Sequence, residues 1–307
     1  MQNIAKINHI QLQLINTNAS IENFITLYKF PLEPKELVKS NYLINRISKL
    51  GIFFQTQVIG LFEFIDFFGV IFIKSISLPF NLNKIRWSDF PELFIRNGIM
   101  ALPITLLIVF LIGLISGYQG ALQLKQFGAD IFIADLVGIS ITRELSPLMV
   151  AILIAGRSGS SFAAQLGTMR VTEEIDALDT MGFDRYNFLV MPRILSVALS
   201  IPILVLICNI VGILGGLIAA MFTLDITLIG YFNRLQDALS IGDVVSGLIK
   251  SWFFGYLVAM IGCFKGLSVS GGADSVGKLT TSSVVAGVFV IILIDAIFTF
   301  LLNTLGI

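Results

Sequence analysis

The stretch IFIADLVGISITRELSPLMVAILIAG, residues 131–156, decides the fold class. It is apolar over more than the roughly 20 residues that a helix needs to cross a bilayer. Arg143 and Glu144 nevertheless stand near its middle. A charge near the centre of a membrane helix costs about 2.5–3.5 kcal/mol, so charges at this depth indicate a functional site or internal ion pairs.

Two other apolar stretches each carry one charge. Lys250 lies in VVSGLIKSWFFGYLVAM, residues 244–260, and Asp295 lies in VVAGVFVIILIDAIFTFLLNTL, residues 284–305. Two basic and two acidic side chains can neutralise one another around one polar spot in an apolar wall, a pattern typical of a protein that moves a molecule through or out of a membrane. The predicted intramembrane charged network consists of four residues: Arg143, Glu144, Lys250 and Asp295.

The composition is that of an integral membrane protein, because 56% of the residues are hydrophobic and 13% are charged. The formal net charge of zero gives no footprint for nucleic-acid binding. Two cysteines and one histidine provide no disulfide framework or Cys/His metal site, and we predict no catalytic residue. We predict an all-α protein with five transmembrane helices, at residues 98–118, 131–156, 194–222, 244–264 and 284–305.

A sixth apolar stretch, Gly51–Ile73, also contains Gln55, Gln57, Glu63 and Asp66. We interpret it as an N-terminal helix that lies in the membrane interface, and a sixth span is the alternative. The residues before this stretch include six Lys or Arg, which a spanning helix would place outside, against the positive-inside rule.

The distribution of basic residues predicts the orientation of the five spans. If the N-terminus is cytoplasmic, the cytoplasmic stretches 1–97, 157–193 and 265–283 hold ten, four and two Lys or Arg residues. The outside loops hold one each, Lys125 and Arg234. Cytoplasmic loops are typically the basic ones, so we predict a cytoplasmic N-terminus.

The loop between the second and third predicted spans contains VTEEIDALDTMGF, residues 171–183, which is typical of a short amphipathic helix. Thr172 is placed to cap its start and Gly182 to end it. Such a helix could lie on the membrane surface or fit a groove in a soluble partner. Its acidic first turns contain Glu173, Glu174 and Asp176. Its narrow apolar stripe consists of Ile175, Leu178 and Met181.

Several glycines are spaced for close helix packing. GRSGSS, residues 156–161, lacks the G-x-x-x-x-G-K-[ST] order of a phosphate-binding loop, so we interpret its small residues as packing positions. The same interpretation applies to three GxxxG pairs, Gly113/Gly117, Gly212/Gly216 and Gly262/Gly266.

The segment RELSPLMVAILIAGRSGSSFAAQLGTMRVTEEIDALDTMGFD, residues 143–184, resembles the MlaE family, the permease subunits of MCE-type lipid ABC transporters. The resemblance continues through PRILSVALSIPIL and VGILGGLIAA, residues 192–204 and 211–220, and through LIKS, residues 248–251. It covers roughly Ile99 to the C-terminus. The patterns R-E-x-x-P, AGR-x-GS and E-x-[IL]-x-[AS]-[LM]-x-x-M carry it.

The resemblance implies a homodimeric core in which each permease has an elbow helix and five spans. It implies a cytoplasmic ABC ATPase, using ATP and Mg, that docks on a coupling helix near residues 171–182. It further implies a bacterial inner-membrane location and a periplasmic MCE-domain protein as partner. The phospholipid pocket would lie at the interface between the two permeases. The coupling residues it implies are Glu173, Glu174, Ile175, Leu178 and Met181.

The resemblance thus implies a non-catalytic permease subunit without a cofactor of its own, which moves phospholipids or related lipids between the inner membrane and the MCE protein. The charged network would then either lock helix packing, contact a phospholipid headgroup or control the opening of the pocket. An ion- or proton-coupled carrier, in which Glu144 and Asp295 titrate, is the alternative, and a structural anchor for the MCE ring is a third possibility. The expected parts are a polar extension at 1–45, an interfacial elbow region at 46–97 and a permease domain at 98–307.

Overall fold

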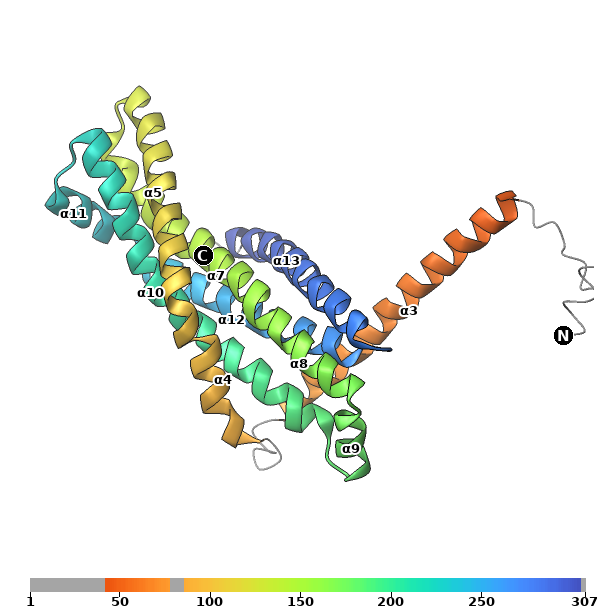
Figure 1. Cartoon of the computed structure of the whole chain (residues 1–307). Coiled ribbons are helices and arrows are strands. Elements are labelled where there is room, and N and C mark those ends of the chain that lie inside the picture. Colours follow the sequence, from red (N-terminus) through yellow and green to blue (C-terminus); the bar gives the residue numbers. More distant parts are fainter. Residues whose placement is uncertain (1–41, 78–85, 305–307) are drawn as a thin grey trace, which may run out of the picture. The chain divides into compact units, whose positions relative to one another are not determined.

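The computed structural model describes residues 42–77 and 86–304, and within these ranges the chain contains helices and no strand (Figure 1). The chain divides into two compact units, Met1–Gly60 and Leu61–Ile307. The polar extension predicted at 1–45 lies almost wholly outside the described residues. The α-helices are α3 Tyr42–Ile76, α4 Phe90–Asn97, α5 Leu102–Phe127, α6 Ile133–Ser140, α7 Ser146–Ile154, α8 Ser160–Val171, α9 Glu174–Thr180, α10 Met191–Leu224, α11 Leu228–Ala238, α12 Ile241–Leu267 and α13 Ala273–Thr304.

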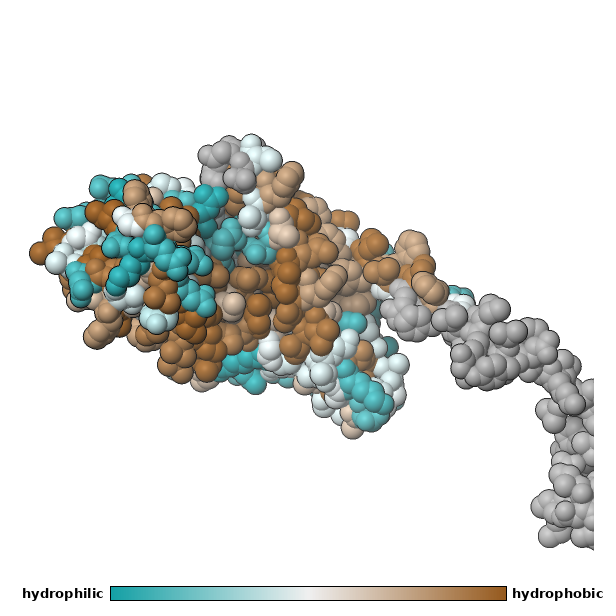
Figure 2. Space-filling model, turned by 90° about the horizontal axis from the view of Figure 1, so that it is seen from above, coloured by the Kyte–Doolittle hydropathy of each residue, from teal (hydrophilic) through white to brown (hydrophobic). Residues whose placement is uncertain are grey.

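Five helical stretches of the described chain are long and apolar enough to cross a membrane, which confirms the predicted number of spans. The outer surface agrees with this, because hydrophobic side chains cover the middle of the face in Figure 2 and hydrophilic ones gather mainly toward its ends. The candidate spans are Trp87–Phe127, Asp130–Val171, Tyr186–Leu224, Ile241–Leu267 and Ala273–Leu302.

The second span differs from its prediction in length. The apolar run ends at Gly156, but the helix continues through α8 to Val171. Two π-helical turns interrupt the span, η6 at Ile141–Leu145 and η7 at Ala155–Gly159. Each π turn adds a residue to the helical repeat and shifts the direction of the side chains around it.

Helix α3 occupies the sixth apolar stretch, and it is not among the five candidate spans. Within the second unit it buries one side, because Phe67 and Ile71 join the main hydrophobic core and the ring of Phe67 lies 5.4 Å from that of Phe264. Its other side exposes apolar residues such as Phe62 and Ile65. This two-sided pattern suits an interfacial helix, although its place at a membrane surface stays a prediction.

The glycines pack helices closely, as predicted. A Cβ atom added to Gly113 of α5 would collide with the carbonyl oxygen of Gly212 in α10. A Cβ on Gly262 of α12 would lie 2.6 Å from the carbonyl oxygen of Gly159 in η7. Since neither helix backbone could stay in place, these positions need a residue without a side chain.

Candidate functional site

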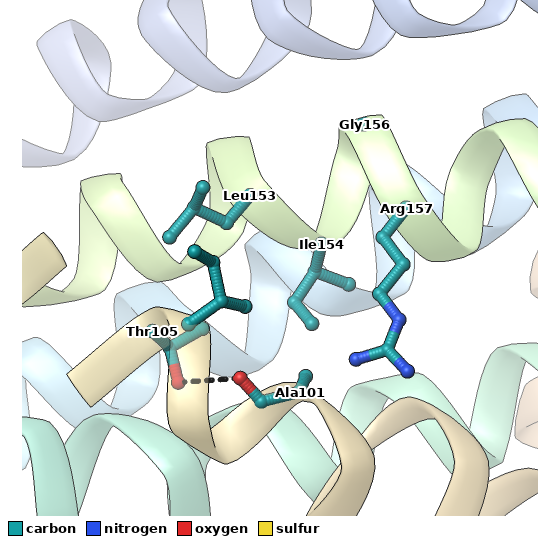
Figure 3. A pocket seen from close by; sticks show the side chains of 7 residues that line it. Ala101, Thr105, Leu153, Ile154, Gly156 and Arg157 are labelled. Atoms are coloured by element: carbon teal, nitrogen blue, oxygen red, sulfur yellow. Dashed lines mark hydrogen bonds between the residues drawn. The ribbon is translucent and has the colours of Figure 1, made fainter. Parts of the chain in front are cut away.

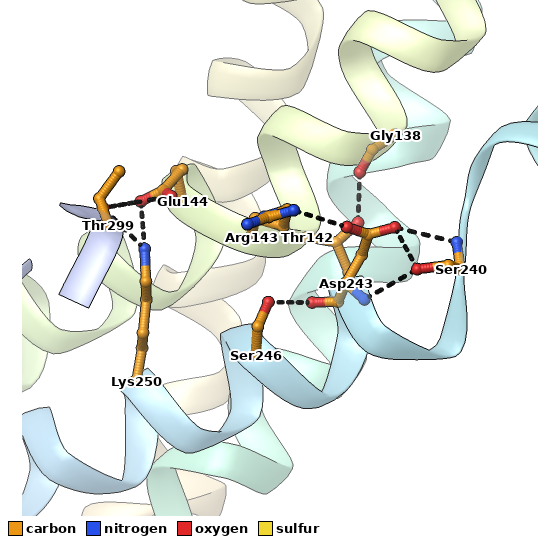
Figure 4. A network of polar contacts seen from close by, with 9 residues as sticks. All are labelled: Gly138, Thr142, Arg143, Glu144, Ser240, Asp243, Ser246, Lys250 and Thr299. Atoms are coloured by element: carbon orange, nitrogen blue, oxygen red, sulfur yellow. Dashed lines mark hydrogen bonds and ion pairs between the residues drawn. The ribbon is translucent and has the colours of Figure 1, made fainter. Parts of the chain in front are cut away.

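Lys250 is the centre of a buried ionic cluster between the second, fourth and fifth spans (Figure 4). Its side chain is 1% exposed, and its Nζ lies 2.6 Å from Oε2 of Glu144 and 3.4 Å from Oδ1 of Asp295. Nζ also donates a hydrogen bond of 3.0 Å to the hydroxyl of Thr299, which lies 3.2 Å from Glu144 Oε2. Three of the four predicted network residues therefore meet, and Thr299 joins them.

Arg143 belongs to a second ionic cluster, contrary to the prediction of one polar spot. Its Nη1 donates to Oδ1 of Asp243 at 3.1 Å. Asp243 also accepts from the backbone N–H and the hydroxyl of Ser240 in a capping box at the start of α12. Arg143 and Glu144 are successive residues of the π turn η6, so their side chains point in different directions and reach different partners.

Asp243 and Thr299 are not among the residues predicted for the network. Asp243 had a readable signal, because Ser240 and Asp243 match the S-x-x-D pattern that precedes an apolar run. Thr299 had none, since a lone threonine in an apolar span is ordinary.

The two clusters differ in charge balance. The Arg143–Asp243 pair is neutral, whereas Lys250 faces two carboxylates and leaves a formal charge of −1. The lysine is buried, while the side chains of Glu144 and Asp295 remain 32% and 17% exposed. This arrangement presents carboxylate oxygens beside α13, where they can accept hydrogen bonds from a cationic or hydroxylated group.

The predicted loop helix exists as α9, but its start differs from the prediction. Thr172 ends α8, and its hydroxyl bonds back to the carbonyl oxygen of Thr168 at 3.0 Å. Glu173 is the N-cap residue of α9 with φ of 60°, and its side chain makes no capping bond. At the other end Gly182 has φ of 81°, and Phe183 N–H bonds the carbonyl of Leu178, so the predicted glycine stop is confirmed.

The apolar stripe of α9 faces mainly the permease itself. Ile175 is 0% exposed and belongs to the main core, and Leu178 packs against that core half-buried. Met181 is 63% exposed. Glu173 and Glu174 are exposed as well. The expectation that the whole stripe is available to a partner is therefore wrong for Ile175, which supports the fold.

Two contacts join α3 to the chain that follows α9. Lys74 forms an ion pair with Asp184, and the ring of Phe67 lies 5.9 Å from that of Tyr186. Partial burial raises the pKa of Asp184, but hydrogen bonds from Lys74 and from the Tyr186 N–H outweigh it and hold this pKa below its ordinary value. The chain that follows α9 is thus tied to α3 within the second unit.

Little of the surface of helix α13 is covered by the rest of the described chain. Only 11% of its most apolar segment is buried, against 61% for α12. Its exposed apolar residues include Phe289, Leu293, Ile297 and Phe300. Such a face suits lipid or another helix.

Comparison with known proteins agrees with this architecture. The family model "Permease MlaE" matches residues 93–301. A probable ABC transporter permease protein of Rickettsia conorii is 36% identical over 257 residues, which cover 84% of this chain and 96% of that protein. One from Synechocystis is 38% identical over 196 residues, 63% of this chain and 74% of that protein.

A plant relative is also similar. The chloroplastic protein TRIGALACTOSYLDIACYLGLYCEROL 1 of Arabidopsis thaliana is 34% identical over 210 residues, which cover 67% of this chain and 60% of that protein. The matched residues 93–301 include both ionic clusters, α9 and nearly all of the five candidate spans. The chain belongs to the MlaE permease family.

Proposed function

We propose that this chain is the permease subunit of an ABC transporter that moves phospholipids between a bacterial inner membrane and a periplasmic MCE protein. The observation that carries the proposal is the family match over all five spans. The plant relative is named after a galactolipid, which supports a lipid as the cargo. The chain itself is non-catalytic in this proposal, and a separate ATPase binds ATP and Mg.

The site residues fit this role in two groups. Glu144, Lys250 and Asp295 form a polar spot beside the exposed face of α13, where a lipid headgroup can be held within an apolar wall. The exposed end of α9, with Met181, provides a surface for the ATPase. Lys250 between two carboxylates also suits an ion- or proton-coupled carrier, which is the second candidate.

Co-purification separates the two candidates. The full-length chain, expressed in its native host and purified in mild detergent, should retain a P-loop ATPase at a fixed ratio. A carrier needs no such subunit, so a permease that is active in vesicles without any bound ATPase would contradict the proposal.

Topology gives a further prediction. Cysteines introduced at Asp179, near the end of α9, and at Gln236, in α11, should react with impermeant reagents from opposite sides of the membrane. Both positions are exposed, they lie at opposite ends of the bundle, and the native Cys208 and Cys263 are buried (Figure 1). We expect Gln236 to label in intact spheroplasts and Asp179 only after the membrane is opened. Labelling of both positions in intact spheroplasts would contradict the cytoplasmic placement of α9.

The exposed face of α13 predicts a dimer. A cysteine at Ile297, which is 46% exposed, should form a disulfide-linked pair of permeases on mild oxidation. Helices in lipid associate through close packing, and α13 has little of its own apolar surface covered within one chain. A cysteine at Ile203 of α10, which is 54% exposed on another helix, is the control and should form no disulfide-linked pair. Native mass spectrometry that finds one permease per complex would overturn the dimer.

A further inference from the structure

A pocket of about 290 Å³ lies between the first and second spans (Figure 3), and none of its lining residues belongs to either ionic cluster. Its walls are apolar, apart from one arginine at its edge. The pocket is lined by Ala101, Ile104 and Thr105 from the first span and by Leu153, Ile154, Gly156 and Arg157 from the second. The hydroxyl of Thr105 donates to the carbonyl oxygens of Ala101 and Leu102, so it adds little polarity to the wall.

Arg157 is exposed and has an incomplete set of partners. Its guanidinium donates to the carbonyl oxygen of Met100, which is neutral. Within residues 42–77 and 86–304, no carboxylate lies within ion-pair distance of it. A guanidinium has five N–H donors, so this one has donors and a full positive charge to offer to an anion.

The position of Arg157 along the second span places it at headgroup level. The apolar run of this span ends at Gly156, and the apolar run of the first span begins at Gly98, close to Met100. Arg157 lies 13 residues beyond Glu144, which corresponds to about 20 Å along a helix. The pocket is therefore on the α9 side of the membrane, in the other leaflet from the Lys250 cluster.

The π turn η7 sets the direction of this arginine. It spans Ala155–Gly159 and so includes both Gly156 and Arg157. The other π turn of the same span, η6, carries Arg143 and Glu144. π turns within α-helices occur frequently at functional sites, and both turns of this span direct charged side chains into polar contacts.

We propose that this pocket binds an anionic glycerophospholipid of the leaflet on the α9 side, with its phosphate at Arg157 and one acyl chain between α5 and α7. The volume is at the lower limit for small-molecule pockets, so it takes part of a lipid and not a whole two-chain molecule. An uncompensated cation selects an anionic headgroup, and the apolar wall selects a chain. The inference rests on the proposed function, since it names the lipid class that the permease receives from this leaflet.

The test measures lipid binding to the full-length permease in its purified complex by native mass spectrometry. The probes are phosphatidylglycerol, which is anionic, phosphatidylcholine, which is zwitterionic, and glycerol 3-phosphate, which lacks chains. The wild type should prefer phosphatidylglycerol, and glycerol 3-phosphate should not displace it. Arg157→Gln should weaken phosphatidylglycerol binding on the order of tenfold, which corresponds to about 1.4 kcal/mol, whereas Arg157→Lys should retain the preference.

A second variant tests the pocket without removing a charge. Nothing lies within 4 Å of a Cβ built on Gly156, so Gly156→Leu extends into free space at the pocket and should weaken the binding of both lipids. Gly69→Leu in α3, where a Cβ is equally unobstructed, is the matched control and should bind as the wild type does. Unchanged phosphatidylglycerol binding in Arg157→Gln, or displacement by glycerol 3-phosphate, would overturn the proposal.

Failure of the proposed function would look different. ATP-driven lipid movement is measured on the same preparation. If the wild type moves no lipid while phosphatidylglycerol binding still depends on Arg157 and Gly156, the pocket stands and the transport proposal fails. If the wild type moves lipid and the variants bind it normally, the pocket proposal fails alone.

Discussion

Replacement of Lys250 by methionine should destabilise the protein by about 3–5 kcal/mol and stop transport. Methionine keeps most of the side-chain volume, so the change removes the charge more than the packing. Glu144 and Asp295 would then face each other without the cation that lies 2.6 Å and 3.4 Å from them. Removing one partner of a buried ion pair leaves an uncompensated charge, which explains the size of the expected effect.

Thermal unfolding in detergent, together with transport in vesicles, measures this effect. Lys278→Met is the matched control, because the ion pair of Lys278 with Asp274 leaves both side chains more than three-quarters exposed, so its loss should change stability little. Adding Glu144→Gln and Asp295→Asn to Lys250→Met should restore much of the stability. A triple variant no more stable than Lys250→Met would show that charge pairing is not what Lys250 provides.

Met181→Asp should release the ATPase and stop transport while the permease inserts and dimerises normally. Met181 is 63% exposed at the end of α9, so an aspartate there is solvated in the permease alone. At an interface with the ATPase the same charge would be buried without a partner, a change that costs several kcal/mol. Binding should therefore weaken on the order of 100-fold or more.

Two comparisons isolate this effect. Ile175→Asp, at a side chain that is 0% exposed, should unfold the loop and reduce the amount of permease in the membrane. Ser270→Asp, at an exposed position between α12 and α13 at the same end of the bundle, should leave ATPase binding intact. Pull-down of the ATPase from membranes with equal permease content decides the matter, and a Met181→Asp variant that retains its ATPase would exclude α9 as the coupling element.

The spans could be predicted from the sequence because each depends on one local property. A run of apolar residues such as 131–156 has to be helical in lipid, where every backbone polar group needs an internal partner. The close glycine contacts, such as Gly262 against Gly159, were readable for a similar reason, since small residues four apart mark a packing face. The predicted second span ends at Gly156, because GRSGSS, residues 156–161, is polar enough to suggest a loop, whereas the helix continues to Val171.

The site could be predicted only in part, because it depends on contacts between distant segments. That Lys250 meets Glu144 and Asp295 followed from charge balance in an apolar environment. Charge balance does not predict that Arg143 pairs with Asp243. The direction of the Arg143 side chain is set by a π turn, and no sequence pattern predicts that turn. The burial of Ile175 was likewise unpredictable, since a three-residue stripe on a short helix fits its own protein as well as a partner.

The central proposal is that this permease moves phospholipid with energy from ATP. Its most direct test is lipid transfer by proteoliposomes that contain the permease, its ATPase and the MCE protein, with a fluorescent phosphatidylglycerol as the cargo. We expect transfer that requires ATP hydrolysis and is unchanged when the proton gradient is collapsed. Transfer that continues without ATP and stops when the gradient is collapsed would contradict it.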